Sequence, residues 1–174
     1  AVYGNSVKII NESALFYADN AKRGEAASVS FDMYFSNNTS RGIVELFEPL
    51  NGETESKASA DNKFHRALYV REDNMISNFN KFDAEGGGRG VKFNYSAQNW
   101  YHFDMWIDYV LRNIKYYMDG ILIGEVVLDD GFENLGGIRY SFSDLGTGGV
   151  CYIDNVQILN FTKRGTFSNI DNIS

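Results

Sequence analysis

Four side chains suited to binding a polar ligand recur at every second position from residue 102 to residue 108, namely His102, Asp104, Trp106 and Asp108. Alternate residues of a β-strand share one face, so a strand here would place these four side chains together. A flat aromatic ring stacks on the C–H face of a sugar, while carboxylates and imidazoles hydrogen-bond its hydroxyl groups. The pattern therefore predicts a carbohydrate-binding face on which the indole of Trp106 points toward solvent.

A second stacking ring is expected on the neighbouring strand. Apolar residues alternate through 114–118, and if they face the core, Lys115 and Tyr117 lie on the same outer face as Trp106. Trp106 and Tyr117 are therefore candidate platforms for a sugar ring. The alternative is structural, because an outward tryptophan can also pack beneath a loop and aromatic residues make up 15% of this chain.

The same acids are poorly spaced for catalysis by themselves. Retaining glycosidases hold two carboxyl groups about 5–5.5 Å apart, and inverting ones hold them about 6.5–9.5 Å apart. Asp104 and Asp108 would lie about 13 Å apart on a strand that rises about 3.3 Å per residue. A catalytic pair would need a third residue from another strand. His102 and Asp104, about 6.6 Å apart along the strand, seldom share a hydrogen bond at such positions.

The element that carries these residues is one of several expected short strands. Apolar and polar residues alternate with a period of two, and no segment has the apolar spacing of a helix with a cap at each end. Asp119-Gly120 is typical of a two-residue hairpin turn. Two antiparallel sheets packed face to face are the usual architecture for this pattern, so we expect an all-β sandwich. The expected strands are residues 27–36, 42–47, 67–70, 100–108, 114–118, 121–123, 137–142 and 151–158.

Composition narrows the domain organisation and the classes of partner. The 174 residues fit a single domain, which we place at 1–163, with 164–174 as a C-terminal tail or closing segment. A formal net charge of −7 argues against nucleic acid and anionic membranes as partners. No apolar run approaches the roughly 20 residues that span a bilayer. The single cysteine, Cys151, excludes an internal disulfide and is expected to be buried and inert.

Several motifs carry a family resemblance. Trp100 opens a long strand, Tyr117-Met118-Asp119-Gly120 forms a strand and turn, Ile153-Asp154-Asn155-Val156 lies in a closing strand, and residues 4–9 form an opening strand. These segments are similar to concanavalin A-like (laminin G-like) jelly-roll modules. The resemblance implies a jelly-roll sandwich and a non-catalytic carbohydrate-binding module within a larger, secreted or surface-exposed bacterial protein. Some modules of this family are polysaccharide lyases or glycoside hydrolases, which form the alternative, because a fold does not determine a function. A protein-binding adhesion module is a third alternative.

The resemblance also implies a structural calcium ion between the opening segment and the last strand. Asp154 occupies the position that would supply a carboxylate, with Asn11, Glu12 or Glu25 as its partners. The alternative is that Asp154 hydrogen-bonds a neighbouring loop.

One enzyme family of this fold is disfavoured by a missing acid. Laminarinase-like hydrolases carry Glu-x-Asp-x-Glu on one strand, whereas the similar segment here has Phe47 in place of the central acid. Glu45 and Glu48 are three residues apart, so they point to opposite faces unless a bulge intervenes.

Overall fold

The computed structural model describes residues 6–9, 12–18, 24–38, 41–48, 64–70, 75–77, 92–128, 131–143 and 148–163. Across these residues the chain forms strands joined by turns, and no helix occurs among them. The described part of the chain accordingly holds no helix that is long and apolar enough to cross a membrane. The expected all-β, two-sheet antiparallel sandwich is confirmed.

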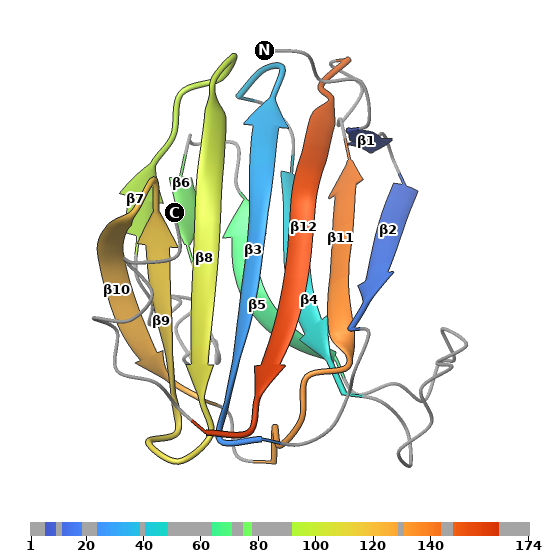
Figure 1. Ribbon diagram of the computed structural model, residues 1–174. Helices are drawn as coiled ribbons and strands as arrows, with labels where there is room; N and C mark the ends of the chain where they lie inside the picture. Colours follow the sequence, from blue (N-terminus) through green and yellow to red (C-terminus); the bar gives the residue numbers. More distant parts are fainter. Residues whose placement is uncertain are drawn as a thin grey trace, which may run out of the picture.

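The strands form two six-stranded sheets, one behind the other in Figure 1, and every strand pairing is antiparallel. We call them the front sheet and the back sheet. In order across the sheet, the front sheet holds β1 (Val7–Ile9), β12 (Cys151–Phe161), β3 (Ala26–Phe35), β8 (Trp100–Asp108), β9 (Asn113–Met118) and β10 (Ile121–Val127). The back sheet holds β2 (Glu12–Tyr17), β11 (Gly137–Ser143), β4 (Arg41–Phe47), β5 (Phe64–Val70), β6 (Met75–Ser77) and β7 (Lys92–Asn94).

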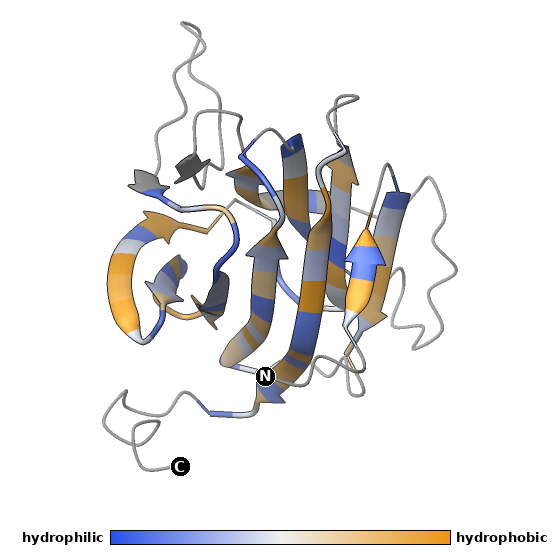
Figure 2. Cartoon of the chain, turned by 90° about the horizontal axis from the view of Figure 1, so that it is seen from above, coloured by the Kyte–Doolittle hydropathy of each residue, from blue (hydrophilic) through white to orange (hydrophobic). Residues whose placement is uncertain are grey.

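The core lies between the inner faces of the two sheets, where alternate residues of each strand are buried. In β3 the buried positions alternate with half-buried ones along almost the whole strand, as the pattern of residues 27–36 predicts. Phe31 of β3 stacks on Phe103 of β8, and its ring lies 5.2 Å from the ring of Tyr140 in the back sheet. Seen from above in Figure 2, strands of both sheets are banded in hydrophilic and hydrophobic colours. Alternation therefore explains both the strands and the packing of one sheet on the other.

The hairpin between β9 and β10 is the one that the sequence predicts. Asp119 and Gly120 both have positive φ angles, 50° and 79°, as a two-residue type I′ turn requires. Three strands of the back sheet, β2, β6 and β7, were not expected from the sequence. β2 reads Glu-Ser-Ala-Leu-Phe-Tyr, which has no clear alternation, and β6 and β7 have three residues each.

The sequence also makes predictions about Cys151 and about residues 164–174. Cys151 is buried in β12 as predicted, and burial raises the pKa of its thiol well above the ordinary value. An inert thiol follows, because the thiolate is the reactive form. Residues 164–174, expected to be a tail or a closing segment, lie outside the described residues.

Candidate functional site

Three aromatic side chains form a row across the outer face of the front sheet. Tyr34 of β3 pairs with Trp100 of β8 on one side and with Tyr152 of β12 on the other. The ring centroid of Tyr34 lies 5.4 Å from that of Trp100 and 5.9 Å from that of Tyr152. All three side chains are half-buried, so each keeps part of its ring at the surface. We call Trp100, Tyr34 and Tyr152 the aromatic row.

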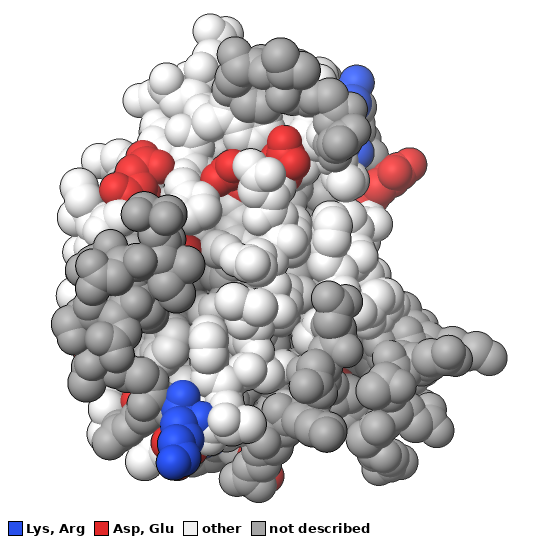
Figure 3. All heavy atoms as spheres, in the orientation of Figure 1, with Lys and Arg blue, Asp and Glu red and all other residues white. Residues whose placement is uncertain are grey.

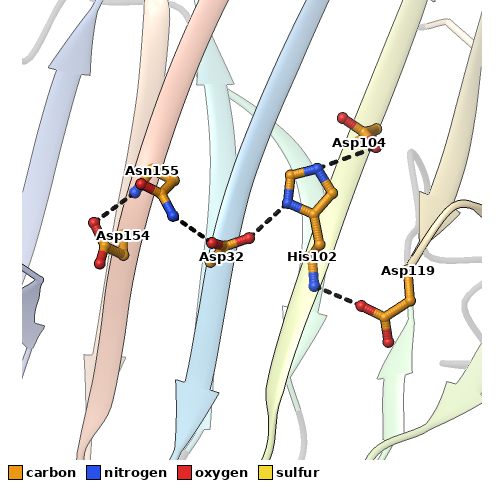
Figure 4. Close-up of polar contacts among 6 residues, drawn as sticks. All are labelled: Asp32, His102, Asp104, Asp119, Asp154 and Asn155. Carbon is orange, nitrogen blue, oxygen red and sulfur yellow. Dashed lines mark hydrogen bonds and ion pairs between the residues drawn. The ribbon is translucent and has the colours of Figure 1, made fainter. Parts of the chain in front are cut away.

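A histidine held between two carboxylates lies directly beside the aromatic row. His102 follows Trp100 by two residues on β8, so it shares the same face. Its Nδ1 lies 2.5 Å from Oδ1 of Asp32 on β3, and its Nε2 lies 3.4 Å from Oδ2 of Asp104 on β8 (Figure 4). The side chains of His102 and Asp104 are 45% and 43% exposed. Both therefore remain accessible to a ligand.

A β-bulge in β12 extends this polar group toward the first strand. The register between β12 and β3 shifts between Asp154 and Gln157, and Asn155 adopts a left-handed φ of 51° that asparagine tolerates. The backbone N–H of Asn155 donates to Oδ1 of Asp154 at 2.7 Å, and its side-chain amide donates to Oδ2 of Asp32 at 2.6 Å. Figure 4 shows the resulting chain of contacts from Asp154 across three strands to Asp104.

The environment of His102 favours its protonated form. Partial burial lowers the pKa of the imidazole, but the hydrogen bond with Asp32 and the charges of Asp104 and Asp32 outweigh this effect. The pKa of His102 is therefore raised above its ordinary value. A protonated His102 offsets one of the negative charges beside it.

The surroundings of this histidine are strongly acidic. In the space-filling view of the front sheet, acidic side chains lie across the upper half of the face, while lysine and arginine lie at its lower left and upper right (Figure 3). Asp119, from the turn between β9 and β10, accepts a hydrogen bond from the backbone N–H of His102 at 2.8 Å. This contact ties the hairpin turn to β8 at the level of the site. We call Asp32, His102, Asp104, Asp154 and Asn155 the polar row.

The structure corrects the expectation that the indole of Trp106 points toward solvent. Trp106 lies on the outer side of β8, but its side chain is only 7% exposed. The ring of Phe161, at the end of β12, covers it with a centroid separation of 5.2 Å. Trp106 therefore packs as a buried residue on the outer face, which is the structural alternative that the sequence left open.

The expectation that Asp108 lies on an accessible face is also wrong. Its side chain is 5% exposed, and Oδ1 accepts hydrogen bonds from the backbone N–H groups of Val110 and Leu111 at 2.9 and 2.7 Å. Asp108 therefore stabilises the turn after β8. Tyr117, on β9, pairs with Asp104 and is half-buried, so of the five predicted binding residues His102, Asp104 and Tyr117 reach the surface. Their role toward a sugar stays a prediction.

The aromatic row and two members of the polar row were missed by sequence reasoning. Asp32 and Tyr34 stand among the outward positions of the strand at residues 27–36, so their face was predictable. Their neighbours were not, because alternation does not say which strand pairs with which. Trp100 was noted only as a family marker, and Asn155 reaches this face through a bulge that has no sequence pattern of its own.

The calcium site also stays a prediction. Asp154 lies in the front sheet and bonds its own neighbour Asn155, whereas Glu12 lies in the back sheet. Asn11 lies outside the described residues, and Glu25, on the surface before β3, donates its backbone N–H to Phe161. Within the described residues no group of three histidine, cysteine or acidic side chains could hold a metal ion.

Glu45 of β4 and Glu48, which directly follows β4, both bind neighbouring parts of the back sheet and its loops. Glu45 is buried and accepts a hydrogen bond from Nε of Arg139 at 2.7 Å. Glu48 accepts hydrogen bonds from the backbone N–H groups of Glu133 and Asn134. Both glutamates thus bind neighbouring parts of the sandwich.

Comparison with known proteins supports the fold. No protein-family model matches the chain, and no curated protein matches its sequence. Among solved structures, the botulinum neurotoxin serotype D binding domain matches with a TM-score of 0.60 at 18% identity, over 98% of this chain and 42% of that chain. The ligand-binding domain of the same serotype, solved in complex with N-acetylneuraminic acid, matches with a TM-score of 0.61 at 17% identity and the same coverage.

A sialidase matches with a TM-score of 0.57 at 17% identity, over 85% of this chain and 15% of that chain. This chain therefore spans less than half the length of each of these three structures. At these identities the likeness defines a class of fold, the two-sheet antiparallel β-sandwich.

Proposed function

We propose that this chain is a non-catalytic carbohydrate-binding module whose site is the aromatic row together with the polar row. The observation that carries this proposal is their adjacency. On each of three neighbouring strands, a half-buried ring and a histidine or carboxylate are two residues apart on the same face. Two residues along a strand span about 6.6 Å. Sugar rings need both kinds of surface, an apolar face to stack on and polar groups that hydrogen-bond hydroxyls.

The aromatic row and the polar row contact different parts of a sugar. Trp100 and Tyr34 offer adjoining ring faces at a centroid distance of 5.4 Å. Asp104 and Asp32 accept hydrogen bonds from sugar hydroxyls, and the imidazole of His102 lies between these two carboxylates. The aromatic row crosses three strands, about 10 Å at the usual spacing of about 4.8 Å, so it suits more than one ring of an extended glycan.

The charge of this face favours an uncharged glycan. Asp32 and Asp104 flank His102, Asp154 lies one strand further along the polar row, and Asp119 stands at the adjoining turn. A sugar carboxylate placed here would meet like charges, which costs about 1 kcal/mol at 4 Å in water and more where solvent is excluded. We therefore propose neutral sugar units as the ligand.

The matched structures support sugar binding in a general sense. One of the toxin domains carries N-acetylneuraminic acid, and another, of type DC, is described in complex with SialylT. Because this chain spans only part of those domains, their particular ligands do not transfer to it. A place outside the cell, within a larger protein that holds further modules, fits the same comparisons and belongs to the proposal.

Isothermal titration of cellohexaose, laminarihexaose, mannohexaose and sialyllactose into the protein tests this function. We expect at least one neutral hexasaccharide to bind, and Trp100→Ala to weaken it by about three- to tenfold, since a stacked ring contributes about 0.5–1.5 kcal/mol. The matched control is Tyr17→Ala, which removes an exposed ring from the back sheet. Binding that is unchanged in Trp100→Ala, or that is followed by release of sugar products, would contradict the proposal.

A further inference from the structure

A pocket of about 400 Å³ lies among four neighbouring strands of the back sheet. The pocket is a shallow depression that is open to solvent over much of its extent. Val44 points into the core, so its neighbour Ile43, which lines the pocket, points away from the core. The pocket is lined by Glu12 and Ser13 of β2, Ser141 and Phe142 of β11, Arg41, Gly42 and Ile43 of β4, and Tyr69 of β5.

One row of side chains crosses the pocket. Ser141 pairs with Ser13 on β2 and with Ile43 on β4, and Ile43 pairs with Tyr69 on β5. The row thus spans four strands, about 14 Å at the usual strand spacing, and ends on a tyrosine ring. It joins two hydroxyl groups, an aliphatic surface and an aromatic ring on a single face.

The polar groups of the pocket suit sugar hydroxyls. Oγ of Ser13 lies 2.6 Å from Oγ of Ser141, and this single bond uses only one of the two hydroxyl hydrogens. Arg41 only donates hydrogen bonds and Glu12 only accepts them, and their opposite charges compensate. A sugar hydroxyl both donates and accepts, so it matches this combination better than a carboxylate or an ammonium group does.

The inner wall of the pocket depends on a glycine. A Cβ atom on Gly42 would lie 1.9 Å from the ring of Phe142, so only glycine lets that ring lie against β4. Phe142 is itself buried among the core residues. Phe142 therefore ties one side of the pocket to the core, while Ser13, Ile43 and Tyr69 line it from the outer face.

We propose that this pocket is a second saccharide-binding site, which takes one uncharged sugar unit and lets the module bind two glycan chains at once. The inference rests on the proposed function of the front sheet and extends it. Because the two sheets pack through their inner faces, the aromatic row and the pocket face in opposite directions. One chain of sugars cannot cover both sites on a single sandwich, so two sites imply cross-linking.

Calorimetric stoichiometry with the same neutral hexasaccharides tests the second site. We expect two binding events per chain in the unaltered protein. Trp100→Ala should weaken one of them, and Tyr69→Ala and Arg41→Gln should each weaken the other. Tyr17→Ala, on the back sheet but outside the pocket lining, should still bind two. Thermal melting of each variant identifies any that fails to fold. If Tyr69→Ala does not fold, Arg41→Gln, at an exposed position, still tests the pocket.

The outcomes separate the two proposals. A single binding event, weakened in Trp100→Ala and unchanged in Tyr69→Ala and Arg41→Gln, overturns the second site and leaves the proposed function standing. A single binding event, weakened only in the pocket variants, supports the pocket and overturns the front-sheet site. No binding of any hexasaccharide overturns both.

Discussion

Nδ1 of His102 lies 2.5 Å from Oδ1 of Asp32, across the pairing of β8 with β3 at the centre of the front sheet. The other ring nitrogen faces Asp104, which pairs with the half-buried Tyr117 on the neighbouring strand β9. The imidazole thus holds two carboxylates in place beside the aromatic row. Its protonation decides how much negative charge this face presents.

The raised pKa of His102 makes stability depend on pH in a definite direction. A group whose pKa is higher in the folded state stabilises the fold fully below its unfolded pKa, about 6.5 for histidine, and less as pH rises through the folded pKa. We therefore expect the free energy of unfolding to fall between mildly acidic and mildly basic pH. Urea denaturation of the protein and of His102→Gln across this range measures the difference.

The advantage of the unaltered protein over His102→Gln should be larger at pH 5.5 than at pH 8.5. Asp104→Asn removes one of the charges that raise the pKa, so the NMR titration midpoint of His102 should move down in that variant. A midpoint unmoved in Asp104→Asn would show that this carboxylate does not act on the histidine.

Trp106→Ala should unfold the protein more easily and leave sugar binding nearly unchanged. Its indole is buried under Phe161, and removing a buried tryptophan costs about 3–5 kcal/mol. At about 2–4 °C per kcal/mol for a chain of this size, the melting temperature should fall by roughly 6–20 °C. Scanning calorimetry measures the melting temperature, and a sugar titration measures the affinity. A variant that melts normally but binds no sugar would restore Trp106 to the binding site.

Asp108→Ala should act in the same way on a smaller scale. The substitution leaves the backbone N–H groups of Val110 and Leu111 without their acceptor, which costs about 1–3 kcal/mol. We expect a melting temperature lower by roughly 2–12 °C. Asp108→Asn keeps an acceptor oxygen and should recover most of the loss. A glycan affinity reduced in both variants, at unchanged stability, would contradict this structural role.

The acidic face should discriminate against charged sugars. We expect sialyllactose to bind at least about tenfold more weakly than the best neutral hexasaccharide, because Asp32 and Asp104 would face its carboxylate. Asp104→Asn should narrow that difference, whereas Glu133→Gln, an exposed acid outside the polar row, should not. Equal affinities for sialyllactose and the neutral hexasaccharide in the unaltered protein would show that the acidic side chains do not determine which sugars bind.

Alternation along the chain predicts most of the architecture because each strand needs one apolar face. It identifies β3, β8 and β9, places His102 and Asp104 on the outer side, and puts the hairpin at Asp119-Gly120. These features depend on neighbouring residues, and the period of two contains that information.

The composition of the site depends on contacts between distant residues, which alternation does not contain. Tyr34 and Trp100 meet through the pairing of β3 with β8, and Trp106 is covered by Phe161, which arrives from the end of another strand. Asn155 reaches the polar row through a bulge. The sequence therefore places His102, Asp104 and Trp106 on the outer side of β8, but it does not show that Phe161 covers Trp106.

The two tryptophans of the chain provide the most direct test. Each contributes one indole N–H signal to an NMR spectrum, and Trp100→Phe assigns them. When the hexasaccharide that binds best is added, the Trp100 signal should shift and the Trp106 signal should stay. A Trp106 signal that moves while that of Trp100 does not would contradict the account.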